Sequence, residues 1–128
     1  AAVSDYRPVQ IAAQKIKKND NGMVLKLEET DDILAAAGVR KDSRVVVGFA
    51  AETENVTANA RKKLIEKNAD LIVANDVSAS DAGFDVDTNR VTLVSADESI
   101  ELPLLTKRAA ADAIVEAAIK IKHARNHS

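Results

Sequence analysis

Three lysines fall within four residues, at Lys15, Lys17 and Lys18, directly before a turn signal at 19–22. On a strand, Lys15 and Lys17 would share one face and Lys18 would face the other way. Three ammonium groups beside a turn can gather an anionic group, which is one interpretation of this cluster. From composition alone the alternative, a solvated surface flap, is favoured.

A second pair of lysines, Lys63 and Lys67, is spaced four residues apart in an expected helix over 55–68. That spacing places both side chains on one helix face, where two ammonium groups would suit a polyphosphate. The alternative is a solvent-exposed face on which Glu52 and Glu66 balance the charge, and exposed charged helix faces are common.

Carboxylate, amide and aromatic side chains complete the candidates for chemistry. A carboxylate can hold the hydroxyl pair of a ribose or a magnesium ion. Phe49 is expected at a strand end, where it could stack on a flat base or simply belong to the core. Asn75 could read a polar ligand edge or serve as a turn residue. The candidate acids are Asp5, Asp31, Asp32, Glu52 and Asp76, of which Asp31 and Asp32 also fit helix capping.

The apolar patterns predict alternating strands and helices. The run Val45-Val46-Val47 is typical of a central strand buried on both faces. Alternation in 23–27 indicates a half-buried strand that pairs with 14–18 as a hairpin or flap. We further expect strands at 44–50, 70–74 and 99–104, a hairpin of 84–86 with 90–94, and helices at 30–38, 55–68 and 106–125.

Strand 44–50, helix 55–68 and strand 70–74 form a right-handed βαβ unit in this scheme. Ligands of such sheets bind outside the carboxyl ends of the strands. Those ends carry residues 48–52 and 75–78, so the polar residues there are the expected ligand edge of a layered α/β domain.

The totals restrict the classes of function. A chain of 128 residues suits one domain. Its 18 basic and 20 acidic residues give a net charge of -2, so we expect neither nucleic acid nor a membrane as a partner. The chain has no cysteine, which excludes disulfides and thiolate catalysis and fits a reducing compartment. No apolar run is long enough to span a bilayer, and we expect a cytoplasmic protein.

Several motifs in order resemble one enzyme family. The sequence Ala-Ala-Val-Ser-Asp-Tyr-Arg at 1–7, Lys-Ile-Lys-Lys at 15–18, Val-Gly-Phe-Ala-Ala-Glu-Thr at 47–53 and Asp-Leu-Ile-Val-Ala-Asn-Asp-Val-Ser at 70–78 resemble the phosphopantothenate–cysteine ligases. The resemblance runs from Ala1 to about Ala118. It implies a Rossmann-like layered α/β domain with a mainly parallel sheet and an added hairpin, Phe84–Val94, used for homodimerisation.

The resemblance also implies a reaction. Bacterial members use CTP and Mg²⁺ to join 4′-phosphopantothenate to cysteine in coenzyme A biosynthesis. FMN is implied only if the flavin-dependent decarboxylase to which many members are fused lies upstream. Rivals from other classes are a non-catalytic α/β dimerisation module and a Rossmann-type oxidoreductase domain, and the missing Gly-rich turn counts against the latter.

Site residues follow from the matched motifs, and the metal ligands stay unassigned. Lys15 would stabilise phosphate charge from a mobile flap, as the main catalytic residue. The implied nucleotide-binding set is Ala1 and Ala2 through their backbone, Asp5 at the sugar, Asp31, Asp32, Ile33 and Leu34 at the base-reading turn, Phe49 beside the base, and Lys15, Lys63 and Lys67.

Two departures from the family pattern set further expectations. Many members have Lys-Asn-Pro-Asp-Ile at the base-reading turn, where this chain has Glu-Thr-Asp-Asp-Ile at 29–33, so Asp31 replaces the proline. The Gly-rich segment of the family and its acyl-intermediate asparagine would lie before Ala1. We therefore expect residues 1–128 to be the C-terminal portion of the ligase domain, without its N-terminal portion and inactive alone.

Overall fold

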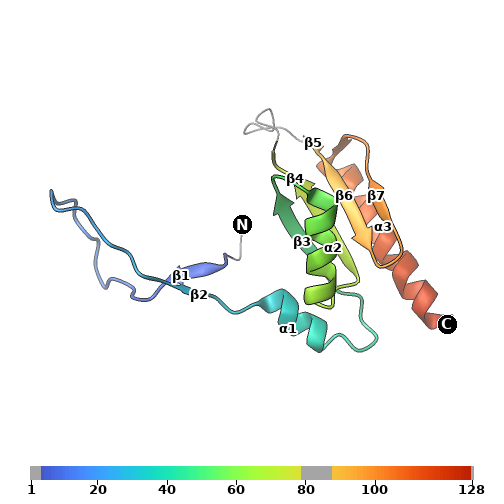
Figure 1. Cartoon of the computed structure of the whole chain (residues 1–128), viewed down its shortest axis with the longest axis horizontal. Coiled ribbons are helices and arrows are strands. Elements are labelled where there is room, and N and C mark those ends of the chain that lie inside the picture. The colour runs from blue at the N-terminus through green and yellow to red at the C-terminus, as the bar shows by residue number, and fades with distance from the viewer. Residues whose placement is uncertain (1–3, 79–87, 128) are drawn as a thin grey trace. The chain divides into compact units, whose positions relative to one another are not determined.

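The computed structural model describes residues 4–78 and 88–127. The chain divides into two compact units, Ala1–Ile33 and Leu34–Ser128, which are taken in turn (Figure 1). In chain order the elements are β1 (Tyr6–Pro8), β2 (Leu27–Glu29), α1 (Ile33–Val39), β3 (Val47–Glu52), α2 (Val56–Glu66), β4 (Leu71–Asp76), β5 (Thr88–Asn89), β6 (Val91–Ser95), β7 (Ser99–Glu101), β8 (Leu105–Thr106) and α3 (Lys107–Asn126).

The first unit is a two-stranded ribbon. β1 and β2 pair antiparallel, with Tyr6 opposite Glu29. A hairpin was expected here, but its predicted strands at 14–18 and 23–27 are misplaced. The strands that pair, Tyr6–Pro8 and Leu27–Glu29, lie further from the turn at 19–22 on both sides. The alternation in 23–27 forms a half-buried strand only where one face is covered, and all five of these residues are exposed.

The second unit contains a four-stranded sheet with the strand order β3-β4-β6-β7. β3 and β4 are parallel, whereas β6 pairs antiparallel with both β4 and β7. The prediction of a mainly parallel sheet is therefore wrong, and the sheet is mixed. The predicted parallel unit from β3 through α2 to β4 is present, but the chain returns from β4 to β6 in the opposite direction.

The hairpin expected at Phe84–Val94 is only partly open to comparison, because 84–87 lie outside the described residues. Thr88 and Asn89 were expected in its turn, but they form β5, which pairs with β8. β6 instead forms a hairpin with β7, closed by a hydrogen bond from Ser95 N to Glu98 O of 2.9 Å. Within β6, Val91 and Val94 are buried in the sheet, so neither side chain is available to a second chain.

β3 lies at an edge of this sheet (Figure 1). The prediction of a central strand buried on both faces is thus wrong for β3, whose Phe49 is 72% exposed. β4 does occupy a central place, and Leu71, Ile72 and Val73 are buried as their unbroken apolar run predicted. An apolar run shows that a strand can be central and covered on both faces. The strands beside it and the helices packed on the sheet decide whether it is.

Helices cover the two faces of the sheet, with α2 on one and α3 on the other (Figure 1). Side chains alternate along the strands, so adjacent residues of β4 belong to different cores. The core under α2 contains Ala50, Ala60, Leu64, Ala69, Ile72, Ala74 and Val94. The core under α3 contains Leu71, Val73, Val91 and Leu93, against Ile114, Ala117 and Ile121 of that helix.

The three helices were all expected from the sequence. Thr106 caps α3, because its Oγ1 accepts a hydrogen bond of 3.2 Å from Ala109 N. Gly38 lies one residue before the end of α1 and is buried against the end of α2. None of the helices in the described ranges has the length and apolar character needed to cross a bilayer.

Candidate functional site

The parallel pairing of β3 and β4 brings two polar strand ends together. Ala51 lies opposite Asn75 and Glu52 opposite Asp76, at the carboxyl end of both strands. This edge is where ligands of α/β sheets bind. The expectation that residues 48–52 and 75–78 share one edge is therefore confirmed.

Glu52 is buried although it carries a carboxylate, with only 9% of the residue exposed. Its Oε1 lies 2.7 Å from Nζ of Lys63, and its Oε2 accepts a hydrogen bond of 3.3 Å from Nδ2 of Asn59. Both partners project from α2, one turn apart. A buried carboxylate needs such partners because desolvation of an unpaired charge is costly.

Lys63 therefore meets Glu52, as the charge-balancing interpretation expected. Glu66, the other proposed partner, pairs instead with Lys62 at 3.8 Å. The Lys63 side chain remains 42% exposed, and an ammonium group has three donors, so the ion pair leaves part of the group open to a further anion.

Lys67 follows α2 as its C-terminal cap, one turn after Lys63. Its backbone N–H donates to Lys63 O at 2.9 Å, which continues the helical bonding. The spacing of four residues thus holds in the structure, and the two lysines come from the same end of one helix.

Asp76 is the last residue of β4, and its side chain binds Ser78. Its Oδ1 accepts hydrogen bonds from Ser78 N at 2.9 Å and from Ser78 Oγ at 2.5 Å. The Ser78 hydroxyl, followed by its backbone N–H and the charge of Arg90, holds the pKa of Asp76 below its ordinary value. Asp76 is therefore a carboxylate with a fixed orientation at the sheet edge.

Phe49 lies on the opposite face of β3 from Glu52, because side chains alternate along the strand. Its ring is largely exposed, so it does not belong to the core. A single ligand can touch both Phe49 and Lys63 only around the free edge or the carboxyl end of β3.

Other residues of the expected nucleotide set lie in the first unit or at the start of α1. Ala1 and Ala2 fall outside the described residues. Asp5, Lys15, Asp31 and Asp32 are exposed, and Asp5 O accepts a hydrogen bond of 2.8 Å from Thr30 N. Ile33, the first residue of α1, is 60% exposed, which leaves it accessible to a ligand.

Leu34 differs from those residues, because it packs on the core under α2 and is half-buried. A Cβ on Gly48 would meet its Cδ2 at 2.7 Å, so the leucine side chain lies directly over the glycine of β3. Leu34 thus has a structural role, and its backbone is the part that a ligand could contact.

A concavity of about 1080 Å³ lies in the first unit, between residues 9–12 and 16–26. Lys17 and Lys18 line it, together with apolar side chains such as Ile16 and Met23. Lys15 is not among its lining residues. The expectation that Lys15 and Lys17 share one face, with Lys18 on the other, is therefore wrong, because residues 15–18 do not form a strand and their side chains do not alternate as on one.

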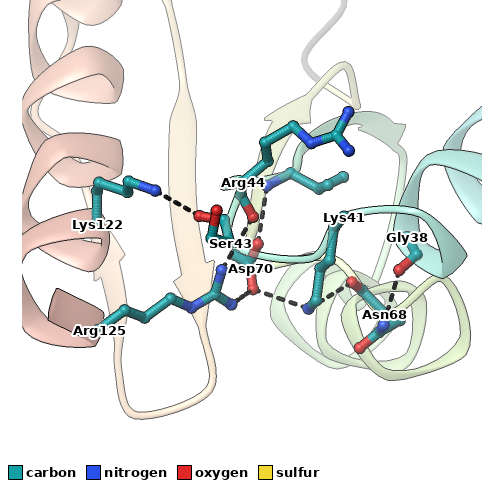
Figure 2. Close-up of polar contacts among 9 residues, drawn as sticks. Gly38, Lys41, Ser43, Arg44, Asn68, Asp70, Lys122 and Arg125 are labelled. Atoms are coloured by element: carbon teal, nitrogen blue, oxygen red, sulfur yellow. Dashed lines mark hydrogen bonds and ion pairs between the residues drawn. The ribbon is translucent and has the colours of Figure 1, made fainter. Parts of the chain in front are cut away.

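A second polar cluster surrounds Asp70 at the opposite, amino-terminal end of β4 (Figure 2). Its carboxylate accepts hydrogen bonds from Val46 N at 2.8 Å, from Lys41 Nζ at 3.0 Å and from the Arg125 guanidinium. Lys122 and Arg125 of α3 also donate to the carbonyl oxygens of Ser43 and Arg44, at 2.5 and 3.0 Å. The sequence did not single out this cluster.

The pKa of Asp70 reflects opposing influences. Burial raises it, but the hydrogen bonds from Val46, Lys41 and Arg125 and the charge of Lys41 outweigh burial and leave the pKa below its ordinary value. Asp70 thereby connects the loop before β3, the start of β4 and the end of α3. Its location away from the carboxyl ends of the strands makes it a structural cluster.

The fold, together with the polar residues at the carboxyl ends of β3 and β4, defines an α/β domain of the kind that binds ligands at the carboxyl ends of parallel strands. Residues 1–121 match the family model described as the DNA/pantothenate metabolism flavoprotein C-terminal domain. The chain belongs to that family.

Named relatives give the same family context. Over 108 residues the chain is 51% identical to the Coenzyme A biosynthesis bifunctional protein CoaBC of Bacillus subtilis, covering 84% of this chain and 27% of that protein. It is 38% identical over 125 residues to a cysteine/cysteine sulfinic acid decarboxylase from an unknown prokaryotic organism, covering 96% and 35%. The chain thus spans about a quarter to a third of these relatives, whose names do not agree on one activity.

Among solved structures, the C-terminal domain of a CoaBC protein matches with a TM-score of 0.70 and 42% identity, over 100% of this chain and 53% of that one. The mixed α/β fold is therefore shared with that domain. The named relatives of the chain include proteins of coenzyme A biosynthesis.

Proposed function

We propose that this chain supplies nucleotide-binding residues to a phosphopantothenate–cysteine ligase that uses CTP in coenzyme A biosynthesis. Membership of the pantothenate metabolism family and the 51% identity to a CoaBC protein support this proposal. The observation that carries it within the fold is the Lys63 ammonium, fixed 2.7 Å from Glu52 at the ligand edge of the sheet.

The proposed reaction has two steps. The carboxylate of 4′-phosphopantothenate attacks the α-phosphate of CTP, which forms an acyl-cytidylate as the bond to the leaving pyrophosphate breaks. The cysteine amine then attacks the acyl carbon, loses a proton and expels CMP. Negative charge develops on phosphate oxygens in the first step, so catalysis needs positioned cations more than a protein nucleophile.

Lys15 is the proposed catalytic residue, because its exposed ammonium can stabilise the charge on the phosphates. Lys63 and Lys67 would contact the nucleotide from the end of α2. Asp5 would accept hydrogen bonds from the ribose, and Phe49 would stack beside the cytosine. Phe49 is free to do so, since most of its surface is uncovered.

Magnesium is the proposed cofactor of this reaction. Among the described residues no three carboxylate, histidine or cysteine groups come together as a metal site. Mg²⁺ commonly binds through substrate phosphates and water with few protein ligands, so the triphosphate itself would supply most of its coordination. It would neutralise charge on the phosphate oxygens.

Calorimetric titration of the full-length protein with CTP and Mg²⁺ tests the proposal. We expect saturable binding that Lys15→Ala weakens and that equimolar ATP does not reproduce. Lys26→Ala is the matched control, because it also removes an exposed lysine from the ribbon and should leave binding unchanged. No heat with CTP would refute the assignment.

A further inference from the structure

Both oxygens of the Glu52 carboxylate accept a hydrogen bond, and both donors belong to side chains of α2. Lys63 Nζ lies 2.7 Å from Oε1, and Asn59 Nδ2 donates to Oε2 at 3.3 Å. The same amide also donates to Glu54 O at 3.0 Å, which orients it. The carboxylate is therefore fixed in position, on the last residue of β3.

Stability alone gives a weak reason for this arrangement. Apolar replacements of buried ion pairs are often neutral or stabilising, because desolvation offsets the attraction between the charges. Here the carboxylate is buried while the lysine is not, with side-chain exposures of 11% and 42%. The geometry therefore fixes an ammonium group at the surface by means of an anion beneath it.

A fixed ammonium group has a consequence for anion binding. A free lysine side chain loses rotamer entropy when a ligand immobilises it. Lys63 has already been ordered by Glu52, and two of its three donors remain for another acceptor. The same helix offers a contrast in Lys62, whose partner Glu66 lies 3.8 Å away and is half exposed.

We propose that Glu52 is a positioning residue, which holds the Lys63 ammonium at the carboxyl end of β3 so that it meets a phosphate of the bound nucleotide. This inference rests on the proposed function, because it requires a nucleotide at this edge. Asn59 assists by fixing the second oxygen of the carboxylate.

Two substitutions of Glu52 separate position from charge. Glu52→Asp keeps the charge but withdraws the carboxylate by one methylene, and Glu52→Gln keeps the reach but removes the charge. Positioning predicts that each raises the dissociation constant of CTP about tenfold in the full-length protein. If Glu52 merely competed with phosphate for Lys63, Glu52→Gln would tighten binding, and that result would overturn the proposal.

A double-mutant cycle with Lys63→Met measures how far the effect of Glu52 on CTP binding depends on Lys63, and a purely structural role of Glu52 would give no such dependence. We expect the Glu52 substitutions to have no further effect on CTP binding once Lys63 is absent. Equal effects in both backgrounds would mean that Glu52 acts on the fold alone. Asn59→Ala, which leaves the ion pair in place, should give a smaller effect with the same dependence on Lys63, and it keeps the cycle informative if Glu52 variants fold poorly.

Controls distinguish this inference from the proposed function. Glu66→Gln changes the solvated pair on the same helix and should leave the affinity for CTP unchanged. If the wild-type protein binds CTP but the Glu52 and Lys63 effects simply add, only the inference is wrong. If the wild-type protein binds no CTP, both fail.

Discussion

A Cβ on Gly38 would lie 1.8 Å from the carbonyl oxygen of Lys67, so α1 and the end of α2 touch through their backbones. Asn68 stabilises this contact with a hydrogen bond of 2.9 Å from its Nδ2 to Gly38 O. Lys67 is a proposed nucleotide ligand, and this close approach fixes the backbone from which its side chain projects.

Gly38→Ala should therefore destabilise the protein by about 3 kcal/mol, because a rigid carbonyl group cannot yield to the added methyl group. Urea denaturation measures the effect. Ala37→Ser is the matched control, since it also adds one heavy atom but at an exposed position of α1, and we expect a change of about 0.5 kcal/mol or less. Equal stability of the Gly38 variant and wild type would contradict the close contact.

Asp70→Asn should cost about 3 kcal/mol at neutral pH, because it leaves Lys41 and Arg125 without the charge that they share. Asp42→Asn is the control: Asp42 pairs with Arg44 at 3.2 Å, but both side chains are largely exposed, so a change within about 0.5 kcal/mol is expected. Chemical denaturation of the two variants separates a buried pair from a solvated one.

The same residue predicts how stability depends on pH. The pKa of Asp70 is lower in the folded state than its ordinary value of 3.8, which holds in the unfolded chain. Its contribution is therefore complete above that value and is lost as the pH falls through the lower folded pKa. The stability difference between wild type and Asp70→Asn should narrow when unfolding is repeated at about pH 3, and a constant difference would contradict the assignment.

Phe49→Ala should separate binding from stability. Loss of base stacking is expected to weaken CTP binding by about 1–3 kcal/mol. The free energy of unfolding should change by about 0.5 kcal/mol or less, because the ring is 72% exposed. Ile65→Ala removes a side chain that is equally exposed, at 74%, and should leave CTP binding intact. An effect of Phe49→Ala on stability but not on CTP binding would place the ring in a structural role.

Local pattern was enough to predict much of this fold. The helices at α1, α2 and α3 and the buried strand β4 follow from the spacing of apolar residues. The parallel β3–α2–β4 unit followed from their order along the chain, and with it the shared edge of Glu52 and Asp76.

The predictions were wrong where a strand's position or direction depends on its neighbours in the sheet. The run Val45-Val46-Val47 is typical of a central strand, but only Val47 belongs to β3, and the place of β3 at the sheet edge depends on strands elsewhere in the chain. The direction of β6 depends on how the chain returns from β4. The cluster around Asp70 joins residues 29 and 55 positions away, at Lys41 and Arg125, a separation at which sequence spacing carries no signal.

The candidate site was predictable in part for the same reason. The four-residue spacing of Lys63 and Lys67 is a local feature of a helix, and their common origin near the end of α2 is confirmed. The ion pair of Lys63 with Glu52 joins residues 11 positions apart, and it forms only when α2 packs on β3. Glu52 was recognised only as one of two possible partners, with Glu66, and its burial distinguishes it from that residue.

The proposed ligase chemistry is tested most directly by a single-turnover reaction of the full-length protein with CTP, Mg²⁺ and 4′-phosphopantothenate, before any cysteine is added. We predict that pyrophosphate is released in an amount equal to the enzyme, and that cysteine then releases CMP. The Lys15→Ala variant should release pyrophosphate more slowly by about a hundredfold or more. Absence of pyrophosphate until cysteine is present, or equal rates for wild type and Lys15→Ala, would contradict the account.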